Sequence, residues 1–309
     1  MISRATEHWA DVILVTLEEH GAIGRGEAAG VEYHGETLDS ISAQIEATRG
    51  AIATGIGRRE LQTLLPPGGA RNALDCALWD LEAKQSGRSV WQLANVAPKR
   101  EIISAFTISI RSLAAYEQRA RALAQYRWLK IKVGQEEPLA AVAAVRRGAP
   151  RARLVVDANQ AWSVAQLERL APELAKLNVD LLEQPVPIDQ DAGLKDLDLP
   201  VPVCADEPAN TLDDLPRLTD RYDFVNIKLD KCGGLTAALD FVAAARGAEM
   251  GLMVGCMIGS SLSMAPAMLV AQSCAVVDLD GPLLQAEDWP DGIEYVNGAM
   301  SLPRRSLWG

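Results

Sequence analysis

The spacing of hydrophobic positions changes near residue 100. Before that point, an apolar run at Asp11–Glu18 predicts a strand, and Gly24–Glu27 predicts the turn that closes it. Helical spacing follows over Thr37–Ala53 and again over Ala70–Lys84. The first hundred residues therefore predict a small α+β unit.

After that point, short apolar runs alternate with segments of helical composition. The predicted strands are Ile103–Ile110, Trp128–Val133, Leu154–Asp157, Val179–Glu183, Val201–Asp206, Phe224–Leu229, Leu252–Cys256 and Ala275–Leu279. The predicted helices include Ser112–Tyr126, Pro138–Arg147, Ser163–Leu177, Leu235–Ala248 and Ser263–Ser273. This alternation predicts a parallel α/β barrel. We expect an α+β capping domain over 1–100, the barrel over 101–282, and a tail over 283–309 that packs back on the capping domain.

Composition narrows the class of protein. A chain of 309 residues is long enough for a barrel and a smaller domain. The net charge of -11 argues against nucleic acid or an anionic membrane as a partner. Five cysteines without a CxxC pair argue against a disulfide framework. There is no apolar run of about 20 residues and no apolar leader at the start, so we expect a cytoplasmic enzyme.

Charged residues recur where the predicted barrel strands end. They are Lys130 and Lys132, Asp157, Glu183, Asp206, Lys228, and the pair Asp278 and Asp280. From Lys132 to Lys228 the steps are 25, 26, 23 and 22 residues, about one β/α unit each. Because the carboxyl ends of barrel strands converge on one mouth, we expect these side chains to face a common centre.

Three of these residues predict a metal site. A single Asp or Glu at a strand end is more often a helix cap or part of a loop ion pair. Carboxylates on three adjacent strands, at Asp157, Glu183 and Asp206, would repel one another unless a cation joined them. Oxygen ligands suit a hard divalent ion, most simply Mg²⁺.

The two lysines of the second strand predict a base. Lys130 and Lys132 share one face of the strand because alternate residues point the same way. A like charge and a metal nearby would lower the pKa of Lys132, so that its amine could take up a proton. The alternative is that one of the two lysines points to solvent or pairs with a carboxylate.

The whole set of motifs resembles the muconate-lactonising subgroup of the enolase superfamily. The segments that carry the resemblance are RNALDCALWDLEAK, DANQAW, LEQP, ADE and NIKLDKCGGL, together with the two lysine positions. The resemblance implies a modified (β/α)₇β TIM barrel with an α+β capping domain. It also implies one Mg²⁺ per subunit on the three carboxylates, Lys132 and Lys228 as the acid–base pair, and compatibility with a homo-oligomer.

Within that subgroup, Asp278-Leu279-Asp280 is similar to the Asp-x-Asp motif of dipeptide epimerases. The likeness is greatest to L-Ala-D/L-Glu epimerases, which act on murein peptide fragments. It implies that Asp278 and Asp280 receive the dipeptide's α-ammonium group, and that a 1,1-proton transfer through an enediolate inverts the C-terminal residue. The alternative for this pair is a solvated turn before Gly281.

Further residues follow from the same resemblance. Asn159 and Glu207 are expected to orient the metal carboxylates, and Thr107 is expected to touch the substrate. Arg4 and the loop Val31–Thr37 correspond to cap segments that close over the site, although Arg4 could equally be a surface arginine. The family has a further strand before the position of Ile2, so either the start given is late or the cap sheet lacks an edge strand.

Two other functions stay open. The first is another enzyme of the subgroup, namely an N-acylamino-acid racemase, an o-succinylbenzoate synthase or a muconate cycloisomerase, none of which needs the two carboxylates of the eighth strand. The second is a catalytically silent barrel that binds a metal or a peptide, because a fold alone does not determine a function. A lysine on each side of the site argues against the silent barrel.

Overall fold

An eight-stranded parallel sheet forms the core of the protein, whose computed structural model describes residues 9–98 and 101–309. Its strands lie in sequence order: β4 (Phe106–Ile108), β5 (Trp128–Lys132), β6 (Arg153–Asp157), β7 (Leu181–Glu183), β8 (Val203–Ala205), β9 (Phe224–Ile227), β10 (Gly251–Val254) and β11 (Val276–Val277). The Ala105 N–H donates to the Val277 carbonyl at 2.7 Å, which joins the two ends of the curled sheet.

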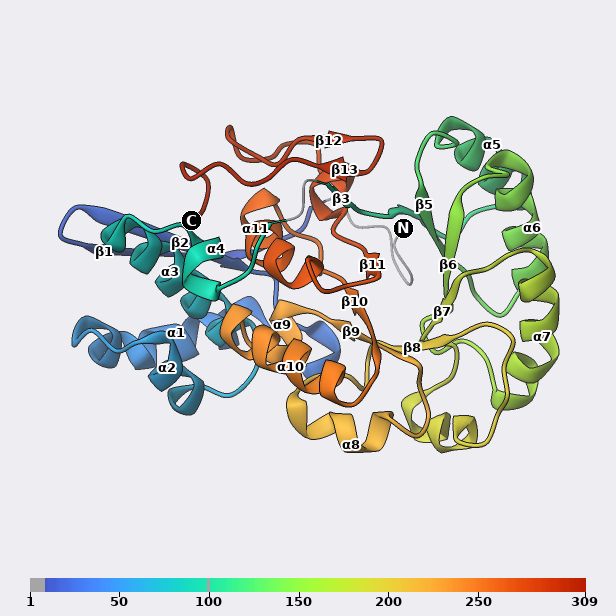
Figure 1. Ribbon diagram of the computed structural model, residues 1–309, viewed down its shortest axis with the longest axis horizontal. Coiled ribbons are helices and arrows are strands. Elements are labelled where there is room, and N and C mark those ends of the chain that lie inside the picture. The colour runs from blue at the N-terminus through green and yellow to red at the C-terminus, as the bar shows by residue number, and fades with distance from the viewer. Residues whose placement is uncertain (1–8, 99–100) are drawn as a thin grey trace.

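Each of the seven connections between these strands contains a helix. The helices are α5 (Leu113–Ala122), α6 (Pro138–Gly148), α7 (Val164–Lys176), η2 (Ile188–Leu194), η3 (Leu212–Asp214) with α8 (Leu215–Leu218), α9 (Leu229–Cys232) with α10 (Leu235–Gly247), and α11 (Ser261–Ala271). Figure 1 shows them around the outside of the sheet. The predicted (β/α)₇β fold is confirmed. In the part of the chain that the structure describes, no helix is long and apolar enough to cross a membrane.

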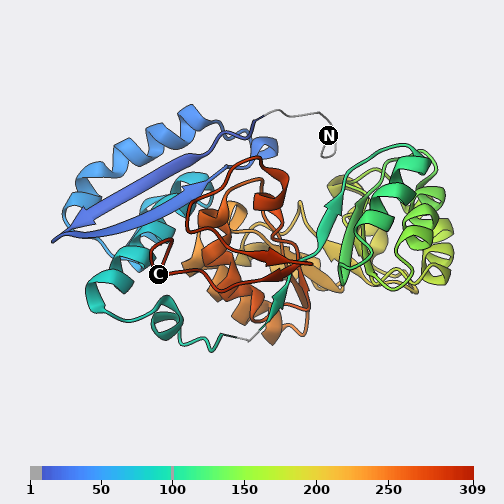
Figure 2. The same ribbon diagram turned by 90° about the horizontal axis from the view of Figure 1, so that it is seen from above.

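The N-terminal part forms a separate α+β unit at one side of the barrel (Figure 2). It consists of an antiparallel hairpin, β1 (Ile13–Glu19) and β2 (Ala22–Ala28), followed by η1 (Glu32–His34), α1 (Leu38–Ala53), α2 (Arg58–Leu64), α3 (Gly69–Ser86) and α4 (Val90–Ala94). Helix α3 packs against the hairpin. The predicted α+β capping domain is thereby confirmed as a unit.

The predicted turn at Gly24–Glu27 is wrong. The chain reverses at His20 and Gly21, both with positive φ, and the two glycines that suggested a turn lie inside β2. A Cβ on Gly24 would stand 2.2 Å from the Ala77 carbonyl oxygen, and one on Gly26 would stand 2.0 Å from that of Ala73. These glycines allow β2 to approach the backbone of α3 closely.

A third sheet, which is antiparallel, pairs the segment just before β4 with the C-terminal segment. The predicted strand Ile103–Ile110 is wrong as one piece, because β3 (Ile102–Ile103) pairs with β13 (Ala299–Met300), which pairs with β12 (Tyr295–Val296), whereas β4 belongs to the barrel. At the end of the chain, the Trp308 indole N–H donates to the Cys76 carbonyl of α3 at 3.0 Å. The domain limits given above stay a prediction.

Candidate active site at the barrel mouth

Strand periodicity produces two layers inside the barrel. The lower layer is apolar and consists of Ala105, Trp128, Val155, Leu181, Cys204, Met253 and Val276. Residues two positions further along a strand point the same way. Two positions after residues of the apolar layer lie polar residues that form a second layer, and all of them are buried: Thr107, Lys130, Asp157, Glu183, Asp206 and Asp278. Charged groups are therefore held at the carboxyl ends of the strands above an apolar floor.

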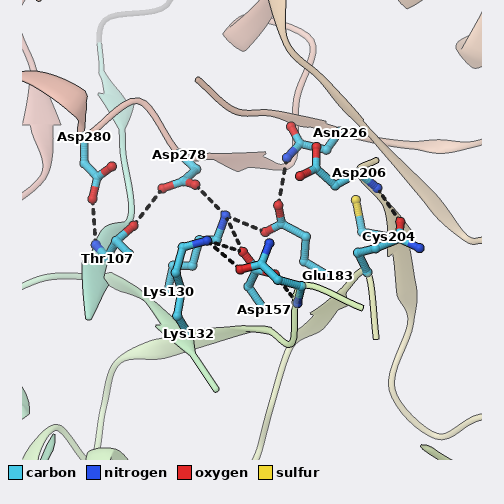
Figure 3. Close-up of polar contacts among 12 residues, drawn as sticks. Thr107, Lys130, Lys132, Asp157, Glu183, Cys204, Asp206, Asn226, Asp278 and Asp280 are labelled. Atoms are coloured by element: carbon cyan, nitrogen blue, oxygen red, sulfur yellow. Dashed lines mark hydrogen bonds and ion pairs between the residues drawn. The ribbon is translucent and has the colours of Figure 1, made fainter. Parts of the chain in front are cut away.

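The structure brings the predicted metal carboxylates together around lysine ammonium groups. Asp157 and Glu183 are register partners at the ends of β6 and β7. Lys130 Nζ lies 2.7 Å from Glu183 Oε2 and 3.2 Å from Asp157 Oδ2. Figure 3 shows this ammonium group pointing at both acids and at Asp278. Burial raises the pKa of Glu183 to about 7, and the carboxylates of Asp157 and Asp206 add to that shift.

Asp206, which follows β8, is bound by two other lysines. Lys228 Nζ donates to Asp206 Oδ2 at 2.8 Å, and Lys231 Nζ donates to Oδ1 at 2.8 Å. Burial by itself raises the pKa of Asp206, but Lys228 and Lys231 together outweigh it and hold the pKa far below its usual range. Asp206 is therefore an ionised acid with a partner on each oxygen.

The two predicted acid–base lysines stand on opposite sides of the mouth. Lys132 ends β5, and its ammonium group donates to Asp157 Oδ2 at 3.0 Å and to Asn159 Oδ1 at 2.8 Å. Lys228 follows β9, which lies four strands away from β5 in an eight-stranded sheet. The carboxylates of Asp157 and Asp206 lie on the strands between them.

Lys130 makes ion pairs. In addition to its ion pairs with Asp157 and Glu183, Lys130 donates a hydrogen bond to Asp278 Oδ2 at 2.9 Å. Burial lowers the pKa of Lys130, but Asp278, Glu183 and Asp157 raise it well above the usual value. Of the alternatives given above for the two lysines of this strand, pairing with a carboxylate is what the structure shows for Lys130.

Asp278 and Asp280 are buried, so the solvated-turn alternative is wrong. The Thr107 N–H donates to Asp280 Oδ2 at 2.7 Å, and the Thr107 hydroxyl lies 3.5 Å from Asp278 Oδ1. Burial and the neighbouring Asp278 raise the pKa of Asp280 to about 7. Because Lys130 already compensates Asp278, Asp280 is the carboxylate of the pair without an ammonium partner among the described residues.

The donor chemistry of this site fits Mg²⁺. Within residues 9–98 and 101–309, no three or more His, Cys, Asp or Glu side chains are arranged to hold a metal ion, since lysine ammonium groups stand between the acids. The acids nevertheless offer buried oxygen donors, which hard divalent ions prefer. Glu183 Oε2 lacks a hydrogen-bond donor in the described chain, since Lys130 approaches it outside hydrogen-bond geometry.

Sequence reasoning missed three residues near this centre. Asn226 Nδ2 donates to Glu183 Oε1 at 2.9 Å, and its position two residues before Lys228, on the same strand face, was the available signal. Lys231 lies one helical turn after Lys228. Tyr33 of η1 lies within the predicted cap loop Val31–Thr37. About half of its surface is exposed, yet desolvation of the phenol raises its pKa, and Asp206, Lys228 and Glu207 also influence that pKa, which places the hydroxyl near the mouth.

The remaining predicted residues have mixed outcomes. The Asn159 N–H donates to Asp157 Oδ1 at 2.9 Å, so Asn159 contacts both Asp157 and Lys132. Glu207 is buried, and its Oε2 has no hydrogen-bond partner in the described chain. Arg4 lies outside the described residues.

A curled (β/α)₇β barrel with carboxylates and lysines at its mouth, beside a small α+β unit, defines the class of two-domain barrel enzymes to which enolases belong. The family model "Mandelate racemase / muconate lactonizing enzyme, N-terminal domain" matches residues 1–94, and "Enolase C-terminal domain-like" matches residues 113–306. The chain belongs to this family of the enolase superfamily, as its motifs predicted.

Close relatives of this chain are isomerases. An L-Ala-D/L-Glu epimerase of Escherichia coli is 38% identical over 98% of this chain and 95% of its own. An N-acetyl-D-glutamate racemase of Pseudoalteromonas is 40% identical over 96% and 95%. The predicted class of enzyme, an isomerase that epimerises amino acids or dipeptides, is confirmed.

Solved structures that resemble this chain include a dipeptide epimerase and a homologue of dipeptide epimerases. An enolase-family member from Agrobacterium tumefaciens, described as homologous to dipeptide epimerases and holding sodium and L-Ala-L-Glu, has a TM-score of 0.97 at 44% identity, covering 100% of this chain and 94% of its own. A dipeptide epimerase of Enterococcus faecalis, with Mg and L-Leu-L-Tyr, has a TM-score of 0.87 at 28% identity, covering 95% and 89%.

Proposed function

We propose that the protein is a dipeptide epimerase that interconverts L-Ala-L-Glu and L-Ala-D-Glu at the glutamate α-carbon. One observation carries the proposal. Lys132 and Lys228 project from strands on opposite sides of the mouth, and carboxylates lie between them. A binding site alone does not need a proton-transferring group on each side. Inversion of a carbon centre does, since the proton must leave one face and arrive at the other.

We place one Mg²⁺ per subunit on Asp157, Glu183 and Asp206. A bound Mg²⁺ supplies positive charge to the substrate carboxylate as the α-carbon loses its proton, which stabilises the enediolate. Support comes from the buried oxygen donors described above and from the Mg and sodium held by the two solved relatives.

Each side chain of the site has its own role in the proposed reaction. One of Lys132 and Lys228 takes the α-proton onto its amine, and the ammonium group of the other gives a proton to the opposite face. Asn159 orients Lys132 by accepting from its Nζ. Glu207 supports the metal carboxylates, and Thr107 holds Asp280 toward the substrate's ammonium group. We also propose that Arg4 binds the side-chain carboxylate of the substrate's glutamate.

Exchange of the α-proton in D₂O tests the two-base assignment. We expect the wild type with Mg²⁺ to place deuterium on the glutamate α-carbon of both epimers. Lys132→Ala and Lys228→Ala should each lose epimerisation, and each should retain exchange with only one epimer, a different one for each variant. Lys195→Ala is the matched control, because Lys195 forms an exposed surface ion pair with Asp220.

Two results would contradict the assignment. Absence of exchange in the folded wild type, across a library of dipeptides, would support a silent barrel. Epimerisation by either alanine variant at the wild-type rate would show that the mutated lysine is not one of the two acid–base groups.

A second function, racemisation of an N-acylated glutamate, is favoured by one contact. Lys130 binds Asp278 at 2.9 Å, which compensates one of the two carboxylates that a free ammonium group would need. One of the relatives is an N-acetyl-D-glutamate racemase. Comparing kcat/KM for L-Ala-D-Glu and N-acetyl-D-glutamate in the same assay separates the two. A larger value for the acetylated substrate would reject the dipeptide assignment.

A further inference from the structure

Lys231 is a buried charge beside the candidate metal site. It lies in α9, one turn after Lys228, and its side chain is 0% exposed. Its ammonium group donates to two atoms of a single residue, Asp206, namely the backbone carbonyl oxygen and Oδ1. Burying an ammonium group is costly unless hydrogen bonds and an opposite charge compensate it. Within the described part of the chain, its ammonium group hydrogen-bonds to Asp206 alone, so its positioning effect falls on that residue.

We propose that Lys231 is a positioning residue that fixes Asp206 so that Oδ2 faces the metal site. The inference rests on the proposed function, because it presumes that Asp206 holds a cation. A carboxylate attached at both its own carbonyl and one oxygen cannot rotate freely about its side-chain bonds. Oδ1 is then committed to Lys231, and Oδ2 remains directed toward the centre of the mouth.

Lys228 provides a contrast within the same chain. Its ammonium group lies 2.8 Å from Asp206 Oδ2, the same distance that separates Lys231 from Oδ1. Lys228 therefore binds the oxygen that a cation would need, whereas Lys231 binds the other one. The two lysines carry the same charge on the same acid and differ in which oxygen they bind.

The support behind Lys231 is rigid. The Lys231 N–H donates to the Lys228 carbonyl, and helix α9 ends at Gly233 in the left-handed conformation. Arg71 of α3 donates to the carbonyls of Cys232 and Gly233 at 2.6 and 3.1 Å. These bonds anchor the backbone that carries Lys231 to both the barrel and the capping unit, as orienting Asp206 requires.

The direction in which metal affinity changes after replacement of Lys231 distinguishes a positioning role from a purely electrostatic one. Lys231 repels a cation through its charge, so a purely electrostatic role predicts tighter metal binding after Lys231→Met. Loss of a residue that orients a metal ligand instead weakens binding by about 10- to 100-fold. Lys228→Met removes an equal charge from the oxygen that the cation needs. It should leave metal binding unchanged or make it tighter.

The experiment measures Mn²⁺ binding to the metal-free protein by electron paramagnetic resonance, with no substrate present. We expect Lys231→Met to raise the Kd for Mn²⁺ by about 10- to 100-fold, Lys228→Met not to raise it, and Lys195→Met to match the wild type. Thermal melts verify folding. If Lys231→Met does not fold, Mn²⁺ binding to Lys231→Gln is measured in its place. Its side chain is uncharged and one bond shorter than that of lysine, so it holds the Asp206 carbonyl and Oδ1 less firmly, and the variant should bind Mn²⁺ more weakly than the wild type.

Activity gives a second readout. Epimerisation by Lys231→Met should recover as Mg²⁺ is raised, because the defect lies in metal affinity, whereas Lys228→Met should stay inactive at every Mg²⁺ concentration. A folded Lys231 variant that binds Mn²⁺ as tightly as the wild type, or more tightly, would overturn this inference alone. A wild type that binds no Mn²⁺ would instead reject the proposed metal site.

Discussion

Replacement of Arg71 by Met should destabilise the whole molecule. Arg71 lies in α3 and is 6% exposed, and its guanidinium donates to four backbone carbonyls. These belong to Gln62 and Leu65 at the end of α2, and to Cys232 and Gly233 at the end of α9. Met is apolar and matches the unbranched stem of the arginine side chain, so Arg71→Met keeps much of the packing of that stem and removes all four hydrogen bonds.

The size of the effect follows from these bonds. A hydrogen bond from a charged donor contributes about 1.5–3 kcal/mol, but four such bonds do not add, because the buried guanidinium also loses its hydration. We therefore expect a loss of about 3–5 kcal/mol, the usual cost of removing one side of a buried polar network. With an unfolding entropy of about 2.1 cal/mol/K per residue, this lowers Tm by roughly 5–8 °C.

Thermal melts followed by circular dichroism measure this change. Arg49→Met is the matched control, because Arg49 is an exposed arginine whose ion pair with Glu46 lies on the surface of α1. Exposed pairs contribute about 0–1 kcal/mol, so the control should melt within about 2 °C of the wild type. A Tm for Arg71→Met that equals that of the control would refute the idea that this arginine stabilises the contact between the capping unit and the barrel.

Three further predictions concern other parts of the molecule. Burial raises the pKa of Asp75 to about 6, so the proton it binds in the folded state stabilises the protein below pH ~4 and this contribution disappears as pH rises through ~6. Asp75→Asn should therefore be more stable relative to the wild type at pH 7.5 than at pH 4.5, by about 2 kcal/mol in urea titrations. Gly26→Ala should cost about 1–3 kcal/mol or more by the same titration, because its Cβ would meet the Ala73 carbonyl, whereas Gly50→Ala, with nothing within 4 Å, should stabilise α1. Asp280→Asn should lower kcat/KM for L-Ala-L-Glu about 10- to 100-fold and leave N-acetylglutamate turnover nearly unchanged, since only the dipeptide has an ammonium group.

The positions of the charged residues at the mouth could be predicted from sequence. Each strand was visible as an apolar run, and each charged residue stood at its end, so Asp157, Glu183 and Asp206 followed from spacing alone. That all strands are parallel and converge is a property of the barrel fold. The burial of Asp278 and Asp280 also agreed with the motif resemblance, although spacing could not exclude a turn.

Other features depend on contacts between distant parts of the chain. Gly24 and Gly26 look like turn residues in sequence, and only the backbone of α3, some fifty residues later, explains them. The run Ile103–Ile110 is continuous in hydropathy, but its first residue, Ile103, pairs with β13 near the C-terminus. The contacts of Lys130 and Lys231 could not be predicted either, because strand and helix periods give direction and not which acid a long flexible side chain reaches.

Charge balance connects the lysines with the metal. The mouth gathers six acids, namely Asp157, Glu183, Asp206, Glu207, Asp278 and Asp280, and four lysines, namely Lys130, Lys132, Lys228 and Lys231. With all of them ionised, two negative charges remain without compensation, in a region where unpaired charge is costly. A divalent cation cancels that excess and a monovalent one leaves half of it. We therefore expect Mg²⁺ to stabilise the folded protein more than Na⁺ does, as seen in the Tm at equal ionic strength.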